Sequence, residues 1–111
     1  VCSDDVIRAQ RIVAATAERM PELGERFYDR GAGRAKEGLR HLIEREVAAG
    51  RLSASDPALA AYQFMELASA GLWRQRLFGK AVTPPAPEVI AATADSAVAM
   101  FLAAYGVPQG T

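Results

Sequence analysis

Two segments near the carboxyl end, residues 57–78 and 87–105, are apolar on too many sides to be ordinary surface helices. A helix on the surface of a monomer has one apolar stripe and a polar opposite face. In the first segment apolar side chains lie at many angles around the axis, and only a thin polar line around Glu66 interrupts them. In the second segment, alanines and Met100 leave the side opposite the apolar face nearly uncharged.

A domain of about five helices cannot surround two of them completely, so part of this apolar surface needs a cover. Large exposed apolar patches are rare on soluble monomers. We therefore expect a homodimer in which the two segments and their copies form a four-helix bundle across a two-fold axis. The alternative is one compact bundle with a small exposed patch. The expected interface residues are Leu72, Ala94, Ala97, Val98, Phe101 and Tyr105.

The remaining pattern predicts an all-α fold in a single domain, residues 1–111, without strands. Start signals include a capping residue at Ser3 or Asp4 and the pair Asp56-Pro57, while Gly31 and Gly33 indicate a stop and a restart. The expected helices cover residues 5–20, 21–29, 34–49, 57–78 and 87–105.

Composition excludes several classes of function. The chain has 13 basic and 13 acidic residues, so no basic patch for nucleic acid or anionic membrane is expected. Its single cysteine, Cys2, cannot form an internal disulfide, which suits a reducing compartment. The apolar stretches, interrupted by Glu66 and Asp95, fall short of the ~20 residues that a membrane span needs. We expect a cytoplasmic protein with no membrane contact, and the abrupt start at Val1 suggests a fragment.

Several short runs, taken in order, resemble the C-terminal domain of TetR-family transcriptional regulators, specifically the AefR-like subgroup. The resemblance covers nearly the whole chain, with Met20 where the subgroup usually has Phe before the proline. The matching runs are residues 11–13, 18–23, 27–28 and 31, then 50–52, 56–57, 60–64, 77–79, 97–98 and 101–106.

The resemblance implies a function that composition cannot show. Such a domain dimerises through its last two helices and holds a small-molecule pocket among the preceding helices. Ligand binding then changes the spacing of two DNA-reading heads and releases the operator of a repressor. Nothing in this chain matches the helix-turn-helix, so DNA would be contacted only through an N-terminal domain absent from the sequence. The alternative function is a free-standing helical module for homodimerisation or protein interaction.

A pocket for an unknown small hydrophobic ligand should combine bulky apolar or aromatic groups with a few inward polar ones. Four candidates share one face of the expected helix 57–78 as a mixed polar and aromatic stripe. The alternative is that its aromatic residues fill the core or the interface while Glu66 reaches solvent or an arginine. The expected ligand-binding residues are Phe27, Tyr28, Tyr62, Glu66, Ser69 and Trp73.

The sequence predicts neither catalysis nor a cofactor. His41 lies near Glu37 and Glu44, but it sits on a charged face without further soft ligands, so a solvated histidine is expected rather than a metal site. No phosphate-binding loop, nucleophile elbow or recognisable carboxylate pair is found. Arg8 and Arg11 could steer an acidic ligand, although a solvated helix face is the preferred interpretation.

Overall fold

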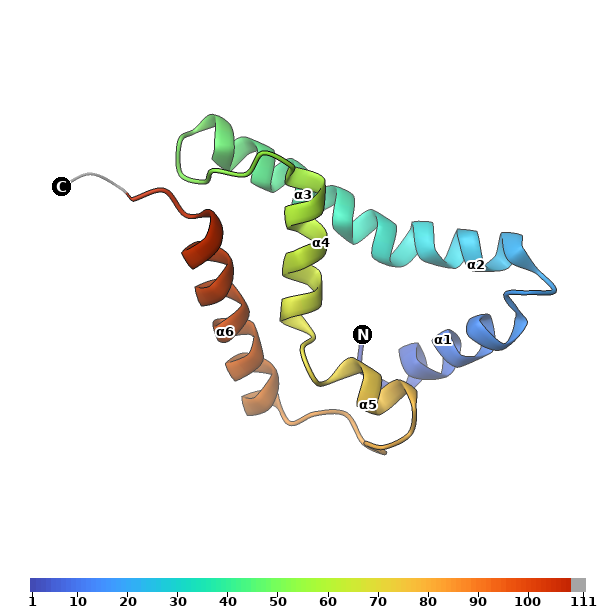
Figure 1. Ribbon diagram of the computed structural model, residues 1–111. Helices are drawn as coiled ribbons and strands as arrows, with labels where there is room; N and C mark the ends of the chain where they lie inside the picture. The colour runs from blue at the N-terminus through green and yellow to red at the C-terminus, as the bar shows by residue number, and fades with distance from the viewer. Residues whose placement is uncertain (109–111) are drawn as a thin grey trace.

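The computed structural model describes residues 1–108 and is all-helical over that range, which confirms the expected fold class. Figure 1 shows α2, η1 and α3 as one long rod, with α1 folded back from one end and α4 descending from the other. Helix α6 runs beside α4, and α5 lies next to the N-terminus. The elements are α1 (Asp4–Thr16), α2 (Pro21–Tyr28), the π-helical segment η1 (Asp29–Gly33), α3 (Arg34–Ala48), α4 (Pro57–Ala68), α5 (Trp73–Leu77) and α6 (Pro87–Tyr105).

The helix starts follow from local chemistry, as the sequence predicts. The Ser3 hydroxyl accepts a hydrogen bond from the Val6 amide at 3.4 Å, and the Asp56 carboxylate accepts one from the Leu59 amide at 3.1 Å. Each bond satisfies an amide that has no partner inside the first turn. Helices α2, α4 and α6 each begin with proline, whose missing N–H is of no consequence at that position.

The expected stop at Gly31 and Gly33 is wrong, because the helix continues through both glycines as η1. Gly33 keeps right-handed helical angles, φ −63° and ψ −43°. A Cβ at this position would lie 3.2 Å from the Tyr28 carbonyl oxygen, tighter than an ordinary contact. The missing side chain therefore allows the wider π turn to close instead of ending the helix. The rod consequently runs unbroken from α2 to α3.

The expected single helix over residues 57–78 is also wrong, since α4 ends at Ala68 and α5 begins at Trp73. Ser69 leaves the helical region (φ −111°, ψ 15°), and Gly71 has φ +74°, a left-handed conformation that favours glycine. The first helix likewise ends at Thr16 rather than at residue 20. The fifth helix matches its expected range, 87–105.

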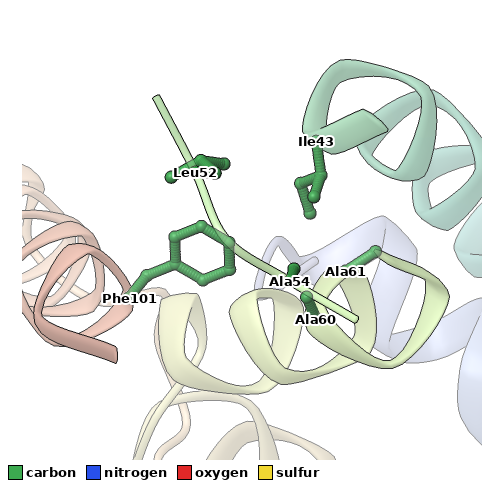
Figure 2. Close-up of a cluster of buried hydrophobic side chains, with 6 residues drawn as sticks. All are labelled: Ile43, Leu52, Ala54, Ala60, Ala61 and Phe101. Carbon is green, nitrogen blue, oxygen red and sulfur yellow. The ribbon is translucent and has the colours of Figure 1, made fainter. Parts of the chain in front are cut away.

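The main core lies where α3, the loop after it, α4 and α6 meet (Figure 2). Phe101 of α6 packs edge-on against Phe64 of α4, with ring centroids 5.3 Å apart. An isolated antiparallel bridge joins Leu52 to Gly106, and it ties the loop after α3 to the end of α6. The buried members of this core are Ile43, Leu52, Ala54, Ala60, Ala61 and Phe101.

The molecule is elongated and thin, and it measures 53 × 33 × 15 Å. Its radius of gyration is 16.2 Å, whereas a compact domain of this length has about 13 Å. It exposes 7751 Å², about 1,850 Å² more than the roughly 5,900 Å² typical of a folded monomer of this mass. Much surface that a compact protein would bury is therefore open.

Candidate functional site

An open groove of about 760 Å³ runs between α4 and α6 and reaches α5; we call it the α4–α6 groove. Its floor includes Phe101, which is buried against α4, while Met100 at its edge is 56% exposed. The Tyr105 hydroxyl donates a hydrogen bond to the Gln63 side-chain oxygen across the groove. The lining residues are Tyr62, Gln63, Glu66, Leu67, Ala70, Gly71, Arg74, Met100, Phe101, Ala104 and Tyr105.

The residues expected at a dimer interface divide into two sets. Ala94 and Val98 are exposed, and Leu72 and Tyr105 are half-buried, so all four can contact another molecule. Ala97 and Phe101 are buried within the protomer itself, and their contact with a partner stays a prediction. Both point from α6 into its contact with α4, because positions separated by one helical turn share a face. Other large apolar residues of α6 are exposed instead, namely Val89, Ile90, Met100 and Leu102.

A second groove, of about 810 Å³, lies where η1 and the start of α3 meet α4; we call it the tyrosine groove. The Tyr28 hydroxyl donates a hydrogen bond to the Tyr62 hydroxyl at 3.2 Å, joining α2 to α4. The Lys36 ammonium lies 5.2 Å from the centre of the Tyr62 ring, a cation–π contact. The lining residues are Tyr28, Asp29, Arg30, Gly33, Arg34, Lys36, Glu37 and Tyr62.

An ion-pair network centred on Glu37 lies at the tyrosine groove. The Arg40 guanidinium donates to Glu37 at 2.6 Å and the Lys36 ammonium donates to it at 2.5 Å, and together they lower the pKa of that carboxyl to about 2. The hydrogen bond to Glu37 in turn raises the pKa of Lys36. Arg30 and Arg34 form no ion pair within residues 1–108. Cationic groups therefore outnumber free carboxylates in this groove.

The Tyr28 phenol is also perturbed. Its hydrogen bond to Tyr62 is the largest cause of a raised pKa, since the neutral form is the one that can donate. The Tyr28 phenol thus stays protonated in neutral solution and offers a hydroxyl group beside positive charge. Such a surface suits an aromatic molecule that carries an acid or phenolic group.

The structure does not bring all the expected ligand-binding residues together. Tyr28 and Tyr62 meet in the tyrosine groove, whereas Glu66 lies in the α4–α6 groove with Tyr62. The Ser69 hydroxyl donates to the Met65 carbonyl oxygen of its own helix at 3.2 Å.

The other two expected residues, Phe27 and Trp73, line neither groove. Phe27 is 37% exposed on α2. The half-buried Trp73 indole donates to the Gln10 side-chain oxygen at 2.6 Å. The expected stripe on one helix face is lost because the helix breaks after residue 68.

Sequence reasoning missed the network that joins α1 to α5. Arg11, interpreted as a solvated residue, donates to the carbonyl oxygens of Arg76 and Leu77 at 2.7 and 3.0 Å and so satisfies the C-terminal end of α5. Arg76 is 4% exposed and donates to the Cys2 carbonyl oxygen at 2.9 Å. It also pairs with Asp4. No periodicity distinguishes these arginines from their exposed neighbours, because their partners lie more than 60 residues away in the chain.

Two further sequence expectations can be compared with the structure. His41 is exposed, and the described part of the chain contains no group of three His, Cys, Asp or Glu residues arranged to hold a metal ion. Helix α6, with 19 residues and a mean hydropathy of 1.3, is long and apolar enough to cross a membrane by length and composition alone. It nevertheless includes Glu88 and Asp95, and it packs along α4.

Comparison with known families and structures gives one consistent assignment. Residues 1–107 match the family described as AefR-like transcriptional repressor, C-terminal domain. A protein from Mesorhizobium loti assigned to the TetR family of transcriptional regulators superimposes with a TM-score of 0.87 at 25% identity, over 96% of this chain and 52% of that one. The flavonoid-responsive regulator FrrA does so with a TM-score of 0.77 at 28% identity, over 89% of this chain and 50% of its own.

A TetR-family regulator from Pseudomonas syringae pv. tomato shares the fold, with a TM-score of 0.76 at 23% identity, over 97% of this chain and 55% of that one. The chain thus spans about half the length of the solved structures it resembles. No curated protein matches it.

Proposed function

Because the chain belongs to the AefR-like C-terminal domains of TetR-family transcriptional repressors, we propose that it is the effector-binding and dimerisation half of such a regulator. A DNA-binding domain outside these residues would read the operator. We place the protein in the cytoplasm, with the apolar face of α6 covered by a second copy rather than by lipid. The acidic residues of α6 and the bridge from Leu52 to Gly106 support this arrangement.

We propose the tyrosine groove as the effector site. The observation that carries this proposal is the hydrogen bond between Tyr28 and Tyr62, which joins the long rod to α4 beside a cluster of cations. The site lies at a π-helical segment, and such segments occur frequently at functional sites. We infer a small, planar aromatic ligand with a carboxylate or phenolic group. The regulator FrrA, which has a similar fold, is described as flavonoid-responsive.

A ligand in this groove would act on the dimer through α4. Tyr62 lines both grooves, so a molecule that separates it from Tyr28 changes the position of a helix that also faces the α4–α6 groove. Two operator half-sites are read at a fixed spacing, so a small rotation between protomers is enough to release DNA. The alternative, a helical interaction module without a regulatory role, would have no need for ligand-dependent movement of α4.

The test is calorimetric titration of the chain with 4-hydroxycinnamate and with the flavonoid naringenin. Tyr28→Phe removes a hydroxyl that lines the tyrosine groove alone, and Tyr105→Phe is the matched control because its hydroxyl lies only in the α4–α6 groove. We expect Tyr28→Phe to weaken binding by about 10-fold, the effect of one lost hydrogen bond, and Tyr105→Phe to leave it unchanged. The reverse pattern would place the ligand in the α4–α6 groove and contradict the proposed site.

A further inference from the structure

The α4–α6 groove is lined by two opposite charges that flank a pair of small residues in the sequence. Glu66 and Arg74 both line the groove, and so do Ala70 and Gly71, which lie between them in the chain. All four residues are exposed. Neither charged side chain forms an ion pair with any of residues 1–108, although the Arg74 guanidinium lies 5.8 Å from the centre of the Trp73 ring. The groove therefore presents an unmatched acid and an unmatched base on one face.

The chain has enough open surface to form a stable interface. Over its whole surface it exposes about 1,850 Å² more than a compact monomer of its mass, and an interface of standard size needs only roughly 800 Å² from each partner. A second copy offers the same apolar edge and the same two charges. In a two-fold dimer the same surface patch of both protomers forms the interface, and the two patches run in opposite directions. A residue on one side of the axis therefore faces the partner's residue from the other side of the patch.

The position of the axis decides which charges meet. An axis beside Glu66 would bring two carboxylates together, and an axis beside Arg74 would bring two guanidinium groups together. Like charges placed opposite each other at an interface are strongly unfavourable. An axis beside Ala70 brings Glu66 of each protomer to Arg74 of the other, so both pairs are attractive. The small side chains of Ala70 and Gly71 also let the two backbones approach at that point.

We propose that the two-fold axis of the dimer passes beside Ala70 and that reciprocal ion pairs between Glu66 and the partner's Arg74 set the register of the two subunits. This inference rests on the dimer of the proposed function and adds its register. Among residues 1–108, no other charged residue lines the groove. The acidic residues of α6, Glu88 and Asp95, lie outside it, so Arg74 has one acidic counterpart within the groove.

Charge reversal in the 111-residue chain tests the register directly. Each single variant, Glu66→Arg or Arg74→Glu, replaces two attractive pairs with two repulsive ones, and we expect dimer Kd to rise by about 100-fold. The double variant restores both pairs in reverse and should return to within about 3-fold of the original Kd. The two single variants mixed together should form a heterodimer in preference to either homodimer, because all four facing charges are then complementary. Sedimentation velocity and native mass spectrometry measure these species.

The controls separate this inference from the function on which it rests. Glu25→Arg, an exposed reversal on α2 outside the groove, should leave the dimer unchanged, and circular dichroism verifies that every variant keeps its helices. A wild-type chain that stays monomeric would overturn the proposed dimer and the register with it. A wild-type dimer that Glu66→Arg does not weaken would overturn the register alone. Rescue of Arg74→Glu by Asp95→Lys instead of Glu66→Arg would also overturn it, since Arg74 would then pair with α6.

Discussion

Replacing Arg76 with methionine should release the first helix from α5. Arg76 is 4% exposed, and its guanidinium donates to the Cys2 carbonyl oxygen at 2.9 Å and to the Ala81 carbonyl oxygen at 3.4 Å. It also pairs with Asp4 at the start of α1. Methionine has a similar length and fills much of the same space, so the variant removes the donors and the charge while leaving most of the packing.

The expected loss of unfolding free energy is estimated from the length of each hydrogen bond and the exposure of each partner of Arg76. A hydrogen bond from a charged group contributes about 1.5–3 kcal/mol, and the bond to Cys2 has the geometry to reach that range. The longer bond to Ala81 adds roughly 0.5 kcal/mol. The Asp4 side chain is 64% exposed and stays hydrated when its partner is removed, so the ion pair adds no more than about 1 kcal/mol. We expect the free energy of unfolding to fall by about 2–4 kcal/mol.

Urea denaturation followed by circular dichroism measures this loss. With a slope of roughly 2 kcal/mol per molar, the midpoint should fall by about 1–2 M without a change in slope. Arg8→Met is the matched control, because Arg8 pairs only with an exposed Asp5 and should change stability by less than about 0.5 kcal/mol. If Arg76→Met were no more destabilising than Arg8→Met, the buried network would not be what holds α1, and this reasoning would be refuted.

Two further predictions concern titration. Glu37 has a pKa of about 2, below its ordinary value of 4.5, so its contribution to stability is complete above pH 4.5 and is lost as the pH falls towards 2. Glu37→Gln should therefore unfold at lower urea than the original chain at pH 6, and the two midpoints should converge near pH 2; a constant gap at all pH values would contradict the ion-pair explanation. The pKa of Tyr28 is raised above 10.0, so the contribution of its hydrogen bond persists below pH 10 and disappears at higher pH. Tyr62→Phe should lower the pKa of Tyr28, as measured by NMR of 13C-labelled tyrosine rings, and an unchanged pKa would argue against the hydroxyl pair.

The sequence was sufficient to predict a structural feature where the residues that determine it lie within a few positions of each other. The Asp56 cap and the starts of α2, α4 and α6 were predicted correctly, and Ser3 is one of the two caps expected for α1, because a cap bonds to an amide two or three positions away. The all-helical class and the excess of apolar surface on α6 could also be predicted. These features depend on residue type and spacing alone.

Breaks in the helices were harder to predict, since glycine permits more than one outcome. Gly31 and Gly33 were expected to end a helix, yet they lie within a continuous π-helical segment. Gly71, within a segment expected to be one helix, takes φ +74° and divides it. A glycine accepts right- and left-handed conformations almost equally, so the surrounding structure decides which one forms.

The candidate site depended most on tertiary structure. Tyr28 and Tyr62 were both expected to bind ligand, but only the tertiary structure shows that their hydroxyls meet, with Lys36 beside them. Phe101 was expected at the dimer interface and is buried within its own protomer, and the enclosure of Arg76 was not predicted at all. A sequence shows that a helix has more apolar surface than one protomer can cover. Only contact with helices distant in the chain determines which part of that side its own protomer covers and which part remains for a partner.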